Sequence, residues 1–176
     1  MAKFSDYRSF ITSDTCARVE VELSYAVKHI EDALGNGLQL QPDFQRNRVW
    51  SKDEQIAYLE YLISGGESGR VIYFNDPYHM GWKESYAANE YHDYVVVDGL
   101  QRLTAVLAFY SNEIPVFGHF FNEFEDKPRR VYLEFRTNSL KTKADVLKWY
   151  IQLNTTGKAH TPEEIEKVKN LLKEEE

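Results

Sequence analysis

The sequence predicts an α+β fold, a small mixed sheet flanked by helices within a single domain. Two observations lead to this fold class. Short segments in which apolar and polar residues alternate, typical of half-buried strands, are interspersed with segments whose apolar residues recur at helical spacing. The length of 176 residues suits one domain. A chain of this size buries enough apolar surface to fold without disulfides or a structural metal.

Strand and helix segments follow one another along the chain. Residues 1–18 show no clear periodicity, so they are expected to form an N-terminal arm, with the domain itself over residues 19–176. The strands are expected at residues 19–23, 38–41, 71–74, 94–97, 114–117 and 131–135. The helices are expected at residues 24–34 and 52–63, from the Asp98-Gly99 turn to residue 111, and at residues 144–153 and 162–172.

Capping residues mark the start of several of these helices. Ser24 is expected to cap the first helix. Ser51 with Glu54 forms the pattern of a capping box ahead of the second. Thr161 followed by Pro162 marks the start of the last helix, because proline suits the first helical position.

Composition and charge limit the kinds of function. The net charge is −7 and the isoelectric point is near 5.3, which argues against broad nonspecific binding to nucleic acid. Cys16 is the only cysteine, so no internal disulfide or cysteine zinc cluster is expected. No apolar run approaches the roughly 18 residues of a membrane helix, and the N-terminus lacks the apolar core of a signal peptide. A cytoplasmic protein without membrane contact is expected.

Residues 95–104 form the centre of the predicted functional site. An apolar strand ends at Asp98 and Gly99, and a helix follows directly. The N–H groups and partial positive charge at a helix N-terminus suit an anion. Gly99 lets a ligand approach the backbone closely, and Arg102 in the first turn can bind a phosphate bidentately. The pattern indicates a phosphate or nucleotide site. The alternative is that Asp98 only caps the helix and Arg102 lies on the surface.

Two loops carry further candidate groups. In the loop 42–50, Gln45 and Arg46 are either solvated residues, with Trp50 as a core anchor, or a second set of donors that face the Asp98 turn. Residues 75–91 form a long polar and aromatic insert. A loop of this length is often a lid or a binding loop, although a family-variable excursion is the favoured interpretation.

Three motifs occur in order along the chain. They are Pro42-Asp43-Phe44-Gln45-Arg46 with Val49-Trp50, Asp98-Gly99-Leu100-Gln101-Arg102-Leu103, and Leu153-Asn154-Thr155-Thr156-Gly157 followed by a helix start at Thr161 and Glu164. Together they resemble the N-terminal domain of GmrSD-type modification-dependent restriction proteins, a branch of the ParB/sulfiredoxin-like superfamily, over about residues 20–172. The family usually has Asp-Gly-Gln-Gln-Arg, and Leu100 takes the place of the first glutamine here.

This resemblance implies binding of a nucleoside triphosphate, often with its hydrolysis, to control nuclease action on DNA. By similarity, Gln101 and Arg102 would hold phosphates and Asp98 would orient them or help to hold Mg²⁺, so these three are the expected catalytic residues. The expected nucleotide-binding residues are Gln45, Arg46, Gly99, Arg102, Thr104 and Asn154.

The sequence is compatible with three functions. The first is a nucleotide-binding switch or weak Mg²⁺-dependent NTPase of the ParB-like group, which acts with a nuclease or defence-protein partner. The second is a DNA-binding or DNA-nicking protein, for instance from a phage or mobile element, which would need a local basic face. The third is a non-catalytic module that binds proteins or inhibits a defence complex. Nuclease activity has no visible motif, because the five histidines lack the spacing of a His-Asn-His domain.

Overall fold

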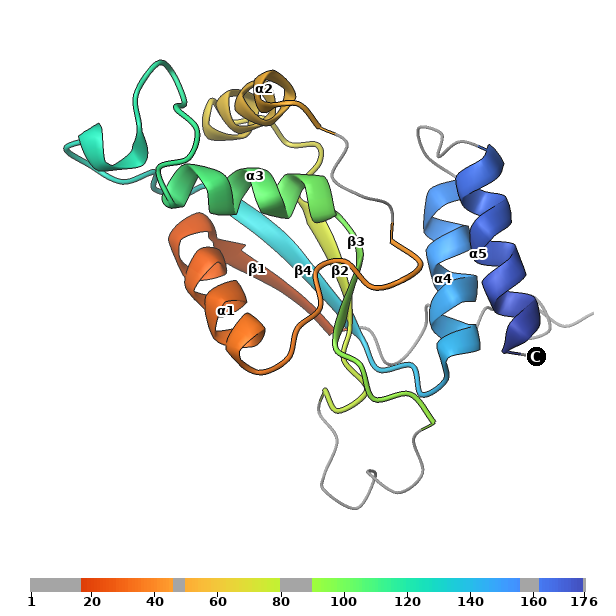
Figure 1. Cartoon of the computed structure of the whole chain (residues 1–176). Coiled ribbons are helices and arrows are strands. Elements are labelled where there is room, and N and C mark those ends of the chain that lie inside the picture. The colour runs from red at the N-terminus through yellow and green to blue at the C-terminus, as the bar shows by residue number, and fades with distance from the viewer. Residues whose placement is uncertain (1–16, 46–49, 80–89, 156–161, 176) are drawn as a thin grey trace, which may run out of the picture.

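A four-stranded mixed sheet forms the centre of the fold (Figure 1). The computed structural model describes residues 17–45, 50–79, 90–155 and 162–175. The strands lie in the order β1-β4-β2-β3. β4 pairs antiparallel with β1 and parallel with β2, and β2 pairs antiparallel with β3. Their bounds are β1 Ala17–Glu22, β2 Val71–Asn75, β3 Val95–Asp98 and β4 Tyr132–Asn138.

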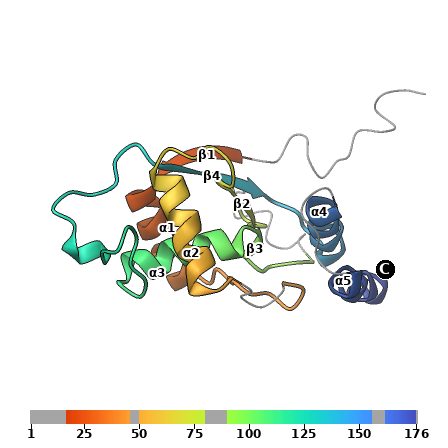
Figure 2. The same cartoon turned by 90° about the horizontal axis from the view of Figure 1, so that it is seen from above.

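The helices of the described segments form two groups (Figures 1 and 2). Helices α1, α2 and α3 pack on one face of the sheet, and α4 and α5 pack against each other beside β3. A single 3-10 turn, η3 (Phe121–Glu123), lies in the connection from α3 to β4. The bounds are α1 Leu23–Gly35, α2 Lys52–Ile63, α3 Leu100–Tyr110, α4 Lys143–Thr155 and α5 Pro162–Glu174.

Alternation along the strands divides the interior into two apolar clusters. Ile72 and Phe74 of β2 pack with α1, α2 and α3, whereas Tyr73 between them packs on the opposite side with α4. In β3, Val96 joins the first cluster, and its neighbours Val95 and Val97 join the second. Because β3 contributes to both clusters, the Asp98 turn at its end lies between the two helical groups.

The expected fold class is confirmed, and most expected elements are present. The helices expected at 52–63 and 162–172 match α2 and α5 closely, and the capping box of Ser51 and Glu54 is formed. No helix of the described segments is long and apolar enough to cross a lipid bilayer.

Two expected strands are wrong. Residues 38–41 make only an isolated bridge, through Gln39 beside Val95, because Pro42 lacks an N–H and the chain then turns away. Residues 114–117 also fail to form a strand, and Val116 instead bridges to His119 across a tight turn. Phe117, inside that turn, has a positive φ of 52°.

Two expected helix boundaries are also wrong. Ser24 does not cap α1, because the helix already begins at Leu23, whose N–H donates to the Val131 carbonyl (2.8 Å) at the end of the β1–β4 pairing. The helix α4 continues to Thr155, so Asn154 lies inside it and not beyond its expected end at residue 153. At the N-terminus β1 begins at Ala17, inside the expected arm.

Candidate functional site

The chain turns sharply between β3 and α3 at Gly99. This residue has φ of +98°, a left-handed conformation that suits glycine. A side chain there would meet Ile72 of β2, since a Cβ would lie 2.7 Å from the Ile72 Cδ1 atom. The first helical hydrogen bond of α3 runs from the Leu103 N–H to the Gly99 carbonyl (2.9 Å). The preceding N–H groups of the first turn form the positive end of the helix dipole.

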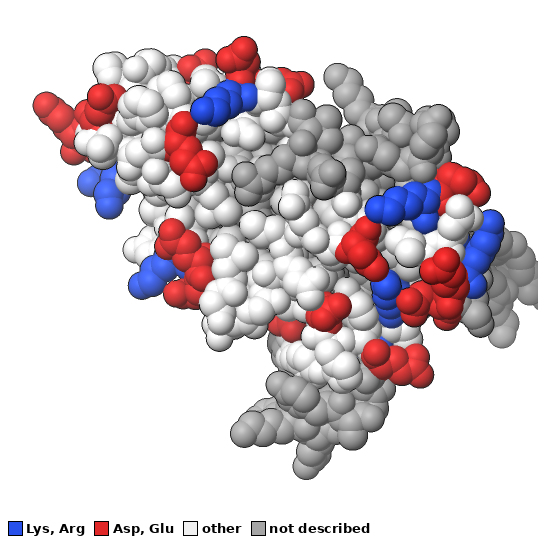
Figure 3. Space-filling model, viewed as in Figure 1, with Lys and Arg blue, Asp and Glu red and all other residues white. Residues whose placement is uncertain are grey.

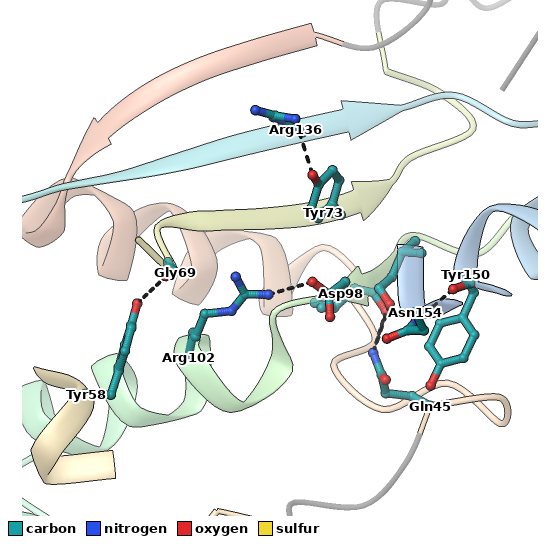
Figure 4. Close-up of polar contacts among 11 residues, drawn as sticks. Gln45, Tyr58, Gly69, Tyr73, Asp98, Arg102, Arg136, Tyr150 and Asn154 are labelled. Atoms are coloured by element: carbon teal, nitrogen blue, oxygen red, sulfur yellow. Dashed lines mark hydrogen bonds and ion pairs between the residues drawn. The ribbon is translucent and has the colours of Figure 1, made fainter. Parts of the chain in front are cut away.

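Asp98 and Arg102 form an ion pair across this turn (Figure 4). The Arg102 Nη2 atom lies 2.5 Å from the Asp98 Oδ2 atom, and the two side chains are 20% and 33% exposed. Asp98 therefore does not act as a side-chain cap, and Arg102 is not a freely solvated surface residue. The pair presents a guanidinium at the helix start.

Tyr58 of α2 and Gly69 lie on the Arg102 side of the turn (Figure 4). The Tyr58 hydroxyl donates to the Gly69 carbonyl (2.9 Å), and a Cβ at Gly69 would lie 3.9 Å from the Arg102 Cδ atom. Burial raises the pKa of Tyr58 to about 12, although the positive charges of Arg102 and Arg70 oppose the rise. Tyr58 thus stays a neutral hydroxyl at physiological pH.

Gln101 connects the turn to the start of α2. Its side chain is only 8% exposed, and its Oε1 atom accepts a hydrogen bond from the Trp50 backbone N–H (3.2 Å). The Trp50 ring packs against the Tyr58 ring in a tilted arrangement, with ring centroids 5.3 Å apart. Trp50 is half-buried and lies outside both apolar clusters, so the expectation of a core anchor is wrong.

Gln45 holds the preceding loop against β3. Its Nε2 atom lies 3.3 Å from both the Val96 and the Val97 carbonyl oxygen atoms. The adjacent Phe44 is buried against Tyr150 of α4 with ring centroids 5.3 Å apart. The Gln45 amide therefore lies beside the strand that leads into the turn (Figure 4).

The remaining expected residues are placed differently. The Thr104 hydroxyl is buried and donates to the Gln101 carbonyl (3.1 Å) within α3. Asn154 is buried at the end of α4, where its side chain donates to the Tyr150 carbonyl (2.7 Å). Arg46 lies outside the described residues. The structure thus gathers Asp98, Gly99, Gln101 and Arg102 at one turn, with Gln45 beside it.

Besides Tyr58, sequence reasoning missed two further neighbours of this turn. Tyr73 of β2 is paired directly opposite Asp98 in the sheet. The Arg136 Nη1 atom of β4 donates to the Tyr73 hydroxyl (3.2 Å), and the guanidinium carbon lies 5.5 Å from the centre of the Tyr73 ring (Figure 4). A hydrogen bond from Arg136 lowers the pKa of Glu134, which stays ionised as its partner. No sequence signal links these strands to the turn.

A polar hollow lies away from the turn, between α1 and the ends of β2 and β3. Its volume is about 580 Å³. The histidine and aspartate residues that line it are His29, Asp32, Asp76, His79, His92 and Asp93. Among the described residues, no three His, Cys, Asp or Glu side chains are arranged to hold a metal ion.

The fold and the turn define a class, an α+β domain with an arginine in the first turn of a helix that follows a tight glycine turn. The family model for the N-terminal domain of the GmrSD restriction endonuclease matches residues 30–173. The chain belongs to this family, which associates it with DNA restriction. Comparisons with curated proteins and with solved structures find no significant match.

Proposed function

We propose that this domain binds a nucleoside triphosphate at the start of α3, in the service of DNA restriction. The observation that carries the proposal is the combination of a helix N-terminus, the close backbone turn at Gly99 and the Arg102 guanidinium at one point. Each of these features favours phosphate, and together they match a polyphosphate better than a single carboxylate ligand.

In this proposal, the phosphates displace Asp98 as the partner of Arg102. A phosphate accepts the same pair of parallel hydrogen bonds from a guanidinium as a carboxylate does. The Asp98 carboxylate then becomes available to Mg²⁺, which commonly binds one or two carboxylates together with phosphate oxygens. The donor set thus fits a magnesium–nucleotide complex. The ion would neutralise phosphate charge.

The other polar groups act around the phosphates. Gln101 is assigned to positioning, because its amide holds the Trp50 backbone at the start of α2. The Gln45 amide is bonded to the Val96 and Val97 carbonyl groups beside the turn, and it would have to leave them to contact the nucleotide. Hydrolysis remains part of the proposal as a slow, Mg²⁺-dependent reaction, and release of inorganic phosphate would measure it.

The test is calorimetric titration of the four ribonucleoside triphosphates with Mg²⁺ against three proteins. Wild type is expected to bind at least one nucleotide with micromolar affinity, and Arg102→Ala is expected to lose this binding while remaining folded. Arg129→Ala is the control, because Arg129 is exposed in the loop after α3. Equal affinity of wild type and a folded Arg102→Ala variant would overturn the assignment.

The charge distribution gives less support to direct DNA binding than the turn gives to nucleotide binding. Figure 3 shows Lys and Arg side chains lying singly among Asp and Glu on the face viewed, with no continuous basic patch. A net charge of −7 points the same way. We therefore place the role of this domain upstream of DNA cleavage, in control by nucleotide.

A further inference from the structure

Strand β1 forms one edge of the sheet. Within the described segments it pairs only with β4. At the end of this pair the Leu23 N–H donates to the Val131 carbonyl. This bond shows which residues of β1 are hydrogen-bonded to β4. In an antiparallel ladder such bonded positions recur at every second residue. Val19 and Val21 therefore bond to β4, while the backbone groups of Arg18 and Glu20 point away from it.

The outer face near this edge carries charges in rows of like sign. The register places Arg18 opposite Arg136 and Glu20 opposite Glu134. Like charges directly opposite one another across a sheet are unfavourable. Within β4, the ion pair between Arg136 and Glu134 (2.5 Å) compensates in part. One row of the monomer is thus positive and the next is negative.

We propose that β1 pairs antiparallel with β1 of a second copy of this chain, in a register centred on Val19. Arg18 then lies opposite Glu20 of the second copy, and Glu20 lies opposite its Arg18. Each of these pairs exchanges both main-chain hydrogen bonds, because their backbone groups point outward. The positive row of one sheet continues into the negative row of the other, and the two sheets become one.

The alternative registers are less favourable because of their backbone bonding or their charge pairs. A shift by one residue would bring groups already bonded to β4 to the new edge and would put apolar and charged side chains on the same face. Centring the pairing on Arg18 or on Glu20 would place two like charges directly opposite each other. The register centred on Val19 avoids both faults.

The apolar side of the edge is consistent with this pairing. Val19 is 56% exposed and Tyr25 of α1 is 67% exposed. Both line a groove of about 380 Å³ between β1 and α1. In the dimer, Val19 packs against its own symmetry mate across the two-fold axis. Exposed, flat strand edges readily pair with another chain.

Sedimentation analysis of the full chain over a range of concentrations tests the proposal. Wild type is expected to form dimers at high concentration. Arg18→Glu and Glu20→Arg should each weaken dimerisation by about tenfold or more, since each makes the cross-copy pairs repulsive. Both variants should fold at least as well as wild type, because each relieves a like-charge contact with β4.

Two further measurements make the test specific. An equimolar mixture of the two single variants should form a heterodimer, and the double variant R18E/E20R should dimerise again, because both combinations restore opposite charges. Glu20→Pro should fold as a monomer, since it removes an outward N–H that β4 does not use. A wild type that stays monomeric up to millimolar concentration would overturn the proposal. So would a dimer that all three single variants leave unchanged.

Discussion

The pair of Asp98 and Arg102 illustrates how a single side chain can serve two partners. In the structure, Asp98 neutralises Arg102. In the proposed complex, a phosphate takes over that task. The carboxylate therefore competes with the nucleotide for the guanidinium, but it also contributes to affinity when Mg²⁺ is present.

This dual role predicts opposite effects for Asp98→Asn. Without Mg²⁺ the variant should bind nucleotide about fivefold more tightly, since a partly exposed ion pair that must be broken is worth up to ~1 kcal/mol. With Mg²⁺ it should lose most of the affinity that the ion adds for wild type. Titrations with and without Mg²⁺ measure both effects, and Asp126→Asn in an exposed loop is the control. Weaker binding in both conditions would show that Asp98 does not compete.

Tyr110 offers a test of polar burial at a single atom. Its hydroxyl is buried without a hydrogen-bond partner among the described residues, and its ring lies against Phe121 with centroids 4.3 Å apart. Removing a buried, unbonded hydroxyl relieves a desolvation cost. Tyr110→Phe should therefore raise the free energy of unfolding by about 1 kcal/mol. Urea denaturation at neutral pH measures the change, with exposed Tyr132→Phe as the control.

The same residue contributes to alkaline instability. Burial raises the pKa of Tyr110 to about 12, above the value of about 10 in an unfolded chain. The folded state thus holds the phenolic proton more tightly, and this contribution is complete below pH 10 and is lost as the pH rises towards 12. Tyr58 and Tyr94 titrate in the same range, so wild type should lose stability there. Tyr110→Phe should lose less, and an identical decline would contradict this account.

The secondary-structure elements are largely predictable, because their signals are local. The helix α2 follows from its capping box and apolar spacing, and the strand–turn–helix from β3 to α3 follows from an apolar run broken at Gly99. The two wrong strand predictions lie where prolines interrupt apolar runs. The residues around Pro42 and Pro115 have the composition of strands, but a proline cannot supply the N–H that continued pairing needs. The left-handed turn at Gly99 was foreseeable, and its contact with Ile72 was not.

The capping box predicts the stability of α2. The Ser51 Oγ atom accepts from the Glu54 N–H (3.2 Å), and the Glu54 carboxylate accepts from the Ser51 N–H (2.8 Å). Ser51→Ala should lower the free energy of unfolding by about 1 kcal/mol. Ser64→Ala at the exposed opposite end of the helix is the control. Thermal denaturation compares the two, and an equal loss for both would indicate that the box contributes nothing.

The arrangement of the whole molecule could not be predicted from the sequence. Nothing local indicates that β4 separates β1 from β2, or that Tyr73 lies opposite Asp98. For the same reason the candidate site was predicted only in part. Its centre comes from one continuous segment and can be proposed from the sequence, whereas Tyr58, Tyr73 and Arg136 approach it from other elements. Burial of Thr104 and Asn154 likewise depends on which helices pack together.

The central position of β4 has a consequence for synthesis of the protein. Both β1 and β2 need β4 as a neighbour, yet β4 is the last of these strands to leave the ribosome. The sheet can be completed only after residue 138 has emerged. Until then, the edges of β1 and β2 that β4 covers stay unpaired. Pairings between distant segments form slowly and leave nascent chains prone to association. The order of the strands therefore makes this domain a late-folding one, for which translation speed and chaperones matter more than for a fold built from neighbouring hairpins.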